Sequence, residues 1–81
     1  MPINLSHVKN MLQREEQVAH TNWEINTLVA ILKDGSRLEV DANEDWLIMS
    51  LQGKKTNNHY RARINPETTN QKVRNFMRTW Q

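Results

Sequence analysis

The chain has 81 residues, which fits a single domain over residues 1–81, and its hydrophobic fraction of 37% supports only a thin core. Because it contains no cysteine, disulfides, thiolate metal sites and cysteine nucleophiles are excluded. The longest apolar run, Leu28 to Leu32, is far shorter than the ~20 residues that cross a bilayer. The amino-terminal residues show neither the basic nor the apolar segment of a secretory signal. We therefore expect a cytoplasmic protein that makes no membrane contact.

Charge is divided unevenly along the chain. Residues 1–50 carry eight acidic and four basic side chains, whereas residues 51–81 carry seven basic side chains and a single acidic one, Glu67. A split of this kind predicts a molecule with one basic region that faces phosphates. The alternative is a solvated surface whose two ends differ in charge without functional meaning.

The first predicted elements are a helix and a long strand. Residues 20–22 form the connector between them. Residues 23–33 alternate and are rich in β-branched residues, which predicts one strand whose second half is covered on both faces. Asp34-Gly35 predicts a tight hairpin turn after it, because glycine adopts positive φ without strain. The helix is expected over residues 2–17, with Asn4 as its N-cap, from apolar residues at helical spacing: Leu5, Val8, Met11 and Leu12.

Three shorter segments with strand character follow, and then a helix. Residues 37–41, 46–52 and 59–64 alternate between apolar and polar positions and are predicted to be strands. Asn65 and Pro66 suit the start of a helix, as the cap and the first helical residue. Apolar residues at helical spacing predict the buried stripe of that helix: Val73, Phe76, Met77 and Trp80.

The order of these elements predicts the fold class. We expect an α+β fold with an N-terminal helix, a three- to four-stranded antiparallel β-meander, and a C-terminal helix packed on one sheet. The sheet's apolar face needs a cover, and the apolar stripes of the two helices can supply it. We expect the tryptophans in the core or at its edge rather than stacked on a ligand: Trp23, Trp46 and Trp80.

Signals of enzymatic chemistry are weak. His7, His20 and His59 lie in different elements without the spacing of metal ligands, and neither glycine opens a helix in a phosphate-binding loop. We therefore expect no metal, no cofactor and no catalytic activity. One catalytic alternative is a small ribonuclease whose acid, base and phosphate clamp come from one strand: His59, Tyr60, Arg61 and Arg63.

The best candidate site is the basic hairpin that leads into the last predicted strand. His59, Arg61 and Arg63 occupy alternate positions, so they project from one face about 6.7 Å apart. Lys54 and Lys55 extend the positive charge into the preceding loop. Arginine suits phosphate because its planar fork donates two parallel hydrogen bonds. We expect this hairpin to contact nucleic acid through the phosphates, without reading sequence.

The C-terminal helix adds further basic side chains to this prediction. Arg74 and Arg78 are four residues apart and share its exposed side, although Arg78 also complements the helix dipole. Together with the hairpin, they complete the predicted nucleic-acid-binding set: Lys54, Lys55, His59, Arg61, Arg63, Lys72, Arg74 and Arg78.

The competing hypothesis is a non-enzymatic protein-binding inhibitor or adaptor, of the kind that a phage or other mobile element encodes. It would act through an exposed edge of the sheet, which also allows a homodimer. It could also act through an acidic face that mimics the phosphates of a nucleic acid: Glu15, Glu16, Glu39, Asp41, Glu44 and Asp45.

Overall fold

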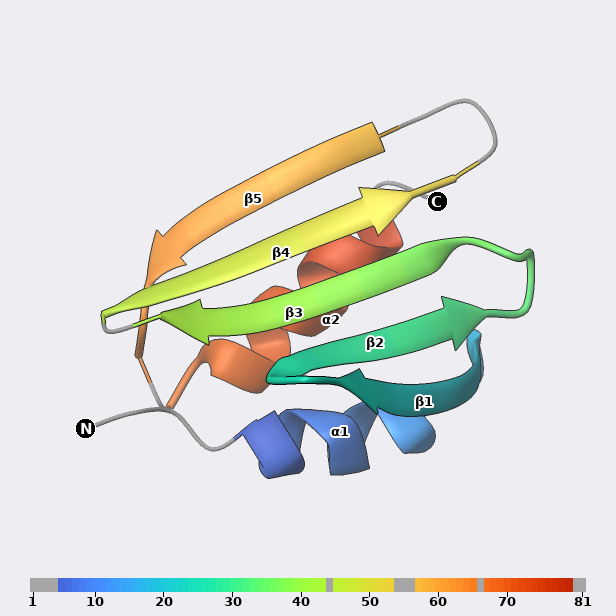
Figure 1. The fold of residues 1–81 in the computed structure, drawn as a ribbon, viewed down its shortest axis with the longest axis horizontal. Helices are drawn as coiled ribbons and strands as arrows, with labels where there is room; N and C mark the ends of the chain where they lie inside the picture. The colour runs from blue at the N-terminus through green and yellow to red at the C-terminus, as the bar shows by residue number, and fades with distance from the viewer. Residues whose placement is uncertain (1–4, 44, 54–56, 66, 80–81) are drawn as a thin grey trace.

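The computed structural model of this chain describes residues 5–43, 45–53, 57–65 and 67–79, and it has the α+β architecture that the sequence predicts (Figure 1). Two helices flank five strands along the chain. The elements are α1 (Leu5–Gln13), β1 (Val18–Glu24), β2 (Thr27–Leu32), β3 (Arg37–Asn43), β4 (Trp46–Gln52), β5 (Asn57–Arg63) and α2 (Thr69–Thr79).

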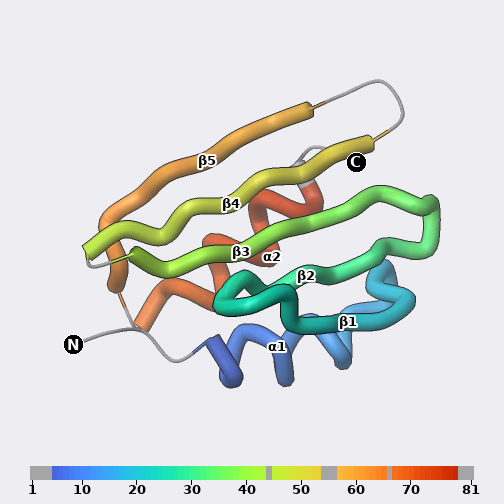
Figure 2. Tube along the Cα trace, in the orientation of Figure 1, coloured from blue at the N-terminus to red at the C-terminus, as the bar shows by residue number. Residues whose placement is uncertain are grey.

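The strands form one antiparallel meander in the order β1-β2-β3-β4-β5. The expected count of three to four strands is therefore too low. The error lies in residues 23–33, which are not one strand. The chain reverses at Ile25 and Asn26, so that Glu24 pairs with Thr27 and the predicted connector 20–22 lies inside β1 (Figure 2).

The missed turn has a physical reason. Ile25 adopts a φ of 59°, a left-handed conformation that β-branched residues resist, and its side chain is 96% exposed. A turn at this place would be signalled by glycine or asparagine at the first position, and isoleucine signals a strand instead. The next turn carries the usual signal and is predicted correctly. Gly35 has a φ of 91°, and the Ser36 amide donates to Asp34 Oδ1 at 2.8 Å.

The core lies between the two helices and one face of the sheet. Phe76 and Met77 are buried in α2, which confirms that part of the predicted stripe, while Trp80 lies outside the described residues. Figure 1 shows α2 behind β3 and α1 beside β1. The core cluster unites both helices with the sheet: Leu5, Val8, Met11, Leu12, Val18, Leu28, Ala30, Leu32, Leu38, Val40, Leu47, Met49, Leu51, Val73, Phe76 and Met77.

Strand β2 is covered on both faces, as predicted for this segment. Leu28 and its alternate neighbours belong to the core cluster, and Val29 is buried on the opposite face. Trp23 lies on the opposite face of the sheet from Val29. It pairs directly with Leu28 across β1 and β2, so the turn at Ile25 places it on the helix side of the sheet.

Both helices are shorter than predicted. Helix α1 ends at Gln13 rather than at residue 17, and β1 starts at Val18. Helix α2 begins at Thr69. Asn65 organises the preceding turn instead of capping the helix, because its Oδ1 accepts the Glu67 amide at 3.0 Å and its carbonyl accepts the Thr69 hydroxyl at 2.7 Å. Asn4, the predicted N-cap of the first helix, and Pro66, the predicted first residue of the last helix, lie outside the described residues.

The face of the sheet turned away from the helices is here called the open face. It carries the charged residues of β3 and β5 and also the apolar residues Val29 and Ile48. Strand β5 is the edge strand at the top of Figure 1, and most of its residues are exposed. Tyr60 lies on the helix side of the sheet, where its ring is 5.8 Å from that of Phe76, but it remains 41% exposed because it belongs to this edge strand. No helix in the described ranges is long and apolar enough to cross a membrane.

Candidate nucleic-acid interface

The register of β4 and β5 places the predicted basic strand on the open face. His59 lies opposite Ser50, Arg61 opposite Ile48, and Arg63 opposite Trp46. Directly opposed residues in an antiparallel pair project to the same side. The three basic side chains therefore share one face, as their alternate spacing predicts.

The structure adds a residue that the sequence did not assign to this site. The guanidinium carbon of Arg61 lies 4.1 Å from the centre of the Trp46 ring, and that of Arg63 lies 5.0 Å from it. Both distances fall within the range of a cation–π interaction. Trp46 is half-buried on the open face and lies outside the core cluster. We call Trp46, Arg61 and Arg63 the Arg–Trp cluster.

Only the register brings this cluster together. The first strand residue of β4 meets the last of β5 because β5 starts at Asn57 opposite Gln52. A strand that began at His59 opposite Gln52, as the predicted boundaries suggest, would instead place Arg63 opposite Ile48. Trp46 and its arginine neighbours are 15 or more positions apart, so no local spacing in the sequence signals their contact.

The two arginines of the cluster differ electrostatically from Arg37, which lies on the same open face. Arg37 forms ion pairs with Glu24 and Glu39, and the hydrogen bond to Glu24 raises the pKa of its guanidinium above the ordinary value. Within the described residues, neither Arg61 nor Arg63 has a carboxylate within ion-pair distance. No described carboxylate therefore competes with an external anion for their charges.

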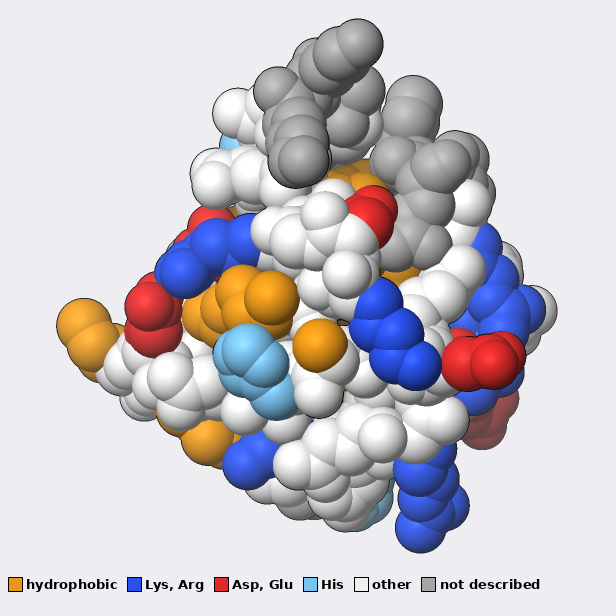
Figure 3. Space-filling view, turned by 90° about the vertical axis from the view of Figure 1, so that its right-hand side faces the viewer, with side chains coloured by type: hydrophobic (Ala, Val, Ile, Leu, Met, Phe, Trp, Pro, Cys, Tyr) orange, Lys and Arg blue, Asp and Glu red, His pale blue; other side chains and the backbone are white. Residues whose placement is uncertain are grey.

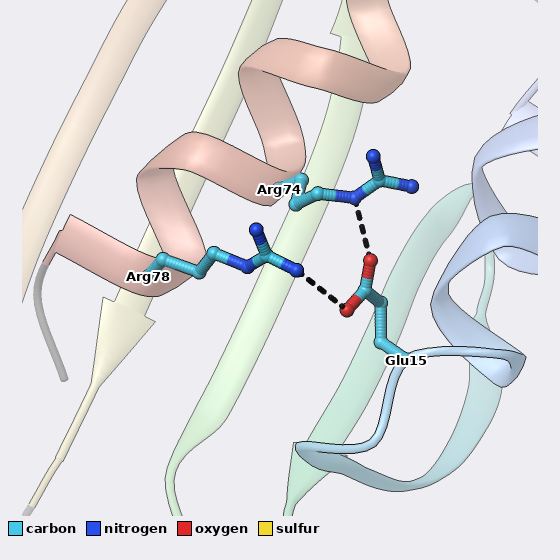
Figure 4. Close-up of polar contacts among 3 residues, drawn as sticks. All are labelled: Glu15, Arg74 and Arg78. Atoms are coloured by element: carbon cyan, nitrogen blue, oxygen red, sulfur yellow. Dashed lines mark hydrogen bonds and ion pairs between the residues drawn. The ribbon is translucent and has the colours of Figure 1, made fainter.

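The basic residues of α2 lie in two different environments. The Lys72 ammonium donates to the Arg63 carbonyl at 3.3 Å, which places Lys72 next to the end of β5. Arg74 and Arg78 instead share the carboxylate of Glu15, which arrives from the loop after α1 (Figure 4). Arg74 Nε donates to Glu15 Oε1 at 2.5 Å, and Arg78 is 3.5 Å from Oε2. The predicted binding set therefore divides into two groups.

The fold partly mixes the charges that are divided along the chain, because Glu15 of the acidic half pairs with Arg74 and Arg78 of the basic half. In Figure 3, the basic side chains on one end of the molecule appear at several separate places, some of them beside acidic ones. The acidic residues are dispersed in the same way. Glu15 pairs with two arginines of α2, whereas Glu24 and Glu39 pair with Arg37. Lys54, Lys55 and Glu44, which also belong to the predicted sites, lie outside the described residues.

The residues of the alternative ribonuclease site are divided between the two faces of the sheet. Tyr60 is on the helix side against Phe76, whereas His59, Arg61 and Arg63 are on the open face. Ser50, opposite His59, has a buried Oγ without a hydrogen-bond partner, so the two residues form no nucleophile–base pair. Among the described residues, no three or more His, Asp or Glu side chains converge on a point that could hold a metal ion.

Comparison with known proteins does not assign a function to this arrangement. No protein-family model, curated protein or solved structure matches this chain. The function must therefore be inferred from the chemistry of the residues themselves.

Proposed function

We propose that this chain is a small non-enzymatic nucleic-acid-binding protein, and that it contacts phosphates through the Arg–Trp cluster with His59 and Lys72 beside it. The observation that supports the proposal most directly is the pair of arginines on Trp46 without a carboxylate partner in the described part of the chain. Stacking on the ring restricts each guanidinium plane, so less rotamer freedom is lost when a phosphate binds.

Single-stranded nucleic acid is the form that this geometry favours. Single strands are bound by positively charged surfaces that also offer flat groups on which unpaired bases stack. The open face at β4 and β5 provides a half-buried indole and two guanidinium planes on adjacent strands. Lys54 and Lys55, which lie between β4 and β5 in the sequence, add positive charge to this part of the chain and remain part of the proposal. Arg74 and Arg78 are left out of it because both pair with Glu15.

Salt-titrated binding tests this proposal. We expect the parent protein to bind a labelled single-stranded oligonucleotide in fluorescence anisotropy at low salt, with an affinity that falls as salt increases. Arg61→Ala combined with Arg63→Ala should weaken binding by one to two orders of magnitude and flatten the salt slope by roughly 1.4, since each contact to a single strand contributes about 0.7. Both side chains are exposed, so the free energy of unfolding should change by less than about 1 kcal/mol.

Two further variants separate the site from net charge. Lys33→Ala removes one positive charge from an exposed residue at the β2–β3 turn, and it should leave affinity within about twofold of the parent. Trp46→Ala should weaken binding about tenfold or more through the loss of stacking, whereas Trp46→Phe should retain part of it. Equal losses from Lys33→Ala and Arg61→Ala would show that binding is diffuse and would contradict the proposed interface.

The inhibitor or adaptor is the second candidate function. The observation that favours it is the free outer edge of β5, on which Tyr60 is exposed next to the α2 helix.

Under the nucleic-acid proposal, Asp41→Ala should leave oligonucleotide binding unchanged or slightly tighter, because it removes a negative charge from the open face. If the parent binds neither single- nor double-stranded DNA or RNA at low salt, the nucleic-acid proposal is wrong and the inhibitor or adaptor takes its place.

A further inference from the structure

A second place on the molecule has the composition of an anion-binding site, and it lies on the helix side, away from the Arg–Trp cluster. Helices α1 and α2 contact each other along part of their length. Between them is a cleft of about 430 Å³, lined by His7, Asn10, Met11, Arg14, Asn70 and Arg74 together with Glu15. This volume is within the range of clefts that hold small molecules, ~300–1,000 Å³.

Both helices turn a polar stripe toward this cleft. His7, Asn10 and Arg14 follow one another at helical spacing along and just beyond α1, while Asn70 and Arg74 are four residues apart on α2. Helices that pack against each other usually do so through apolar side chains. Here only Met11 is apolar among the lining residues, so the cleft is a polar gap next to the core.

The position of Arg74 indicates which ligand this gap suits. Its Nε donates to Glu15, and the two terminal nitrogens of the same guanidinium lie on the side away from Glu15 (Figure 4). The ion pair therefore orients the arginine while leaving its fork of donors unused by Glu15. A fork of this kind binds the two oxygens of a phosphate or carboxylate.

The charge balance of the cleft also favours an anion. Glu15 is the only carboxylate among the described residues that line it, and this carboxylate is shared by Arg74 and Arg78. Arg14 lies on the opposite wall with an exposed side chain and no ion pair to any described residue. Asn10 and Asn70 add amide donors, which can bind phosphate oxygens that the arginines do not reach.

From these observations we infer that the cleft between α1 and α2 binds the phosphate group of a small molecule. Arg74 and Arg14 contact the phosphate oxygens from opposite walls, and Asn10 and Asn70 donate further hydrogen bonds. The inference does not depend on the proposed function, because the open face and this cleft share no residue.

Inorganic pyrophosphate is the probe for this site, in a buffer without other phosphates. We expect saturable chemical-shift changes in the side-chain amides of Asn10 and Asn70 and in the Arg74 Nε–H signal. Arg14→Gln should weaken binding about tenfold, the loss of one charge-assisted contact. It should not affect folding, because Arg14 is exposed and has no ion pair with any described residue. Arg74→Lys keeps the charge without the fork and should weaken binding at least as much, with its thermal melt recorded as a check on folding.

The variant Arg61→Ala with Arg63→Ala is the matched control, since it removes two arginines from the open face and should leave pyrophosphate binding unchanged. The inference is overturned if pyrophosphate does not saturate at millimolar concentrations, or if Arg14→Gln binds like the parent. It is also overturned if Arg14→Gln weakens oligonucleotide binding as much as pyrophosphate binding, because the cleft would then serve a nucleic-acid backbone. A parent protein that binds pyrophosphate but no oligonucleotide would contradict only the proposed function.

Discussion

Replacement of Phe76 by alanine tests how α2 is held on the sheet. The Phe76 side chain is 5% exposed, belongs to the core cluster and packs its ring near that of Tyr60 on β5. Its removal costs the transfer energy of the ring and leaves a cavity, about 3–4 kcal/mol in total. Since a chain of this length has a free energy of unfolding of roughly 5–8 kcal/mol, about half of the stability would be lost.

Urea and thermal unfolding, followed by tryptophan fluorescence, measure this loss. At about 4–8 °C per kcal/mol for a small domain, the midpoint temperature of Phe76→Ala should fall by roughly 12–30 °C. Tyr60→Ala is the control, because it removes the other ring of the same pair from a residue that is 41% exposed, and it should cost only about 1 kcal/mol. A Phe76→Ala variant that melts within a degree or two of the parent, or no lower than Tyr60→Ala, would refute the packing of α2.

Three other substitutions test particular contacts and backbone positions by the same unfolding measurements. Gly35→Val should destabilise the fold by about 2 kcal/mol. The cost comes from backbone strain at a φ of 91° and not from a clash, because nothing lies within 4 Å of an added Cβ. An unchanged stability would contradict the tight turn. Ile25→Gly should stabilise by about 1 kcal/mol, since the side chain at this left-handed position is almost fully exposed and glycine relieves its strain; a lower stability would show that the side chain makes contacts of its own. Glu15→Gln should lower the free energy of unfolding by only about 1 kcal/mol, because the paired Arg74 and Arg78 side chains are 41% and 58% exposed and therefore partly screened by solvent. This cost should shrink in high salt. A cost that does not change with salt would mean that it does not arise from charge.

The sequence by itself determines the elements that have strong local signals. Alternation predicts strand β4 and the glycine predicts the turn at Gly35. Leu38 and Val40, the apolar positions of the predicted strand 37–41, are buried. The buried stripe of α2 follows from its helical period. These features depend on residues a few positions apart, so the pattern along the chain is sufficient to predict them.

Strand β1 was missed because its signals conflict with its structure. Most of its residues are exposed, so it lacks the apolar alternation of a covered strand, and its turn contains an isoleucine in a conformation that isoleucine resists. Pairing with β2 supplies the backbone hydrogen bonds that hold this segment as a strand. The strand propensity of these residues does not by itself predict this pairing.

Which residues come together in the candidate sites depends on tertiary structure even more than the missed strand does. The sequence placed His59, Arg61 and Arg63 on one face, but only the pairing of β4 with β5 brings Trp46 to the two arginines. No acidic partner of Arg74 is evident in the sequence, but the fold places Glu15, which is far from it along the chain, within ion-pair distance. The net charge of a segment follows from composition, whereas the availability of each charge depends on neighbours that only the folded chain brings within a few ångströms.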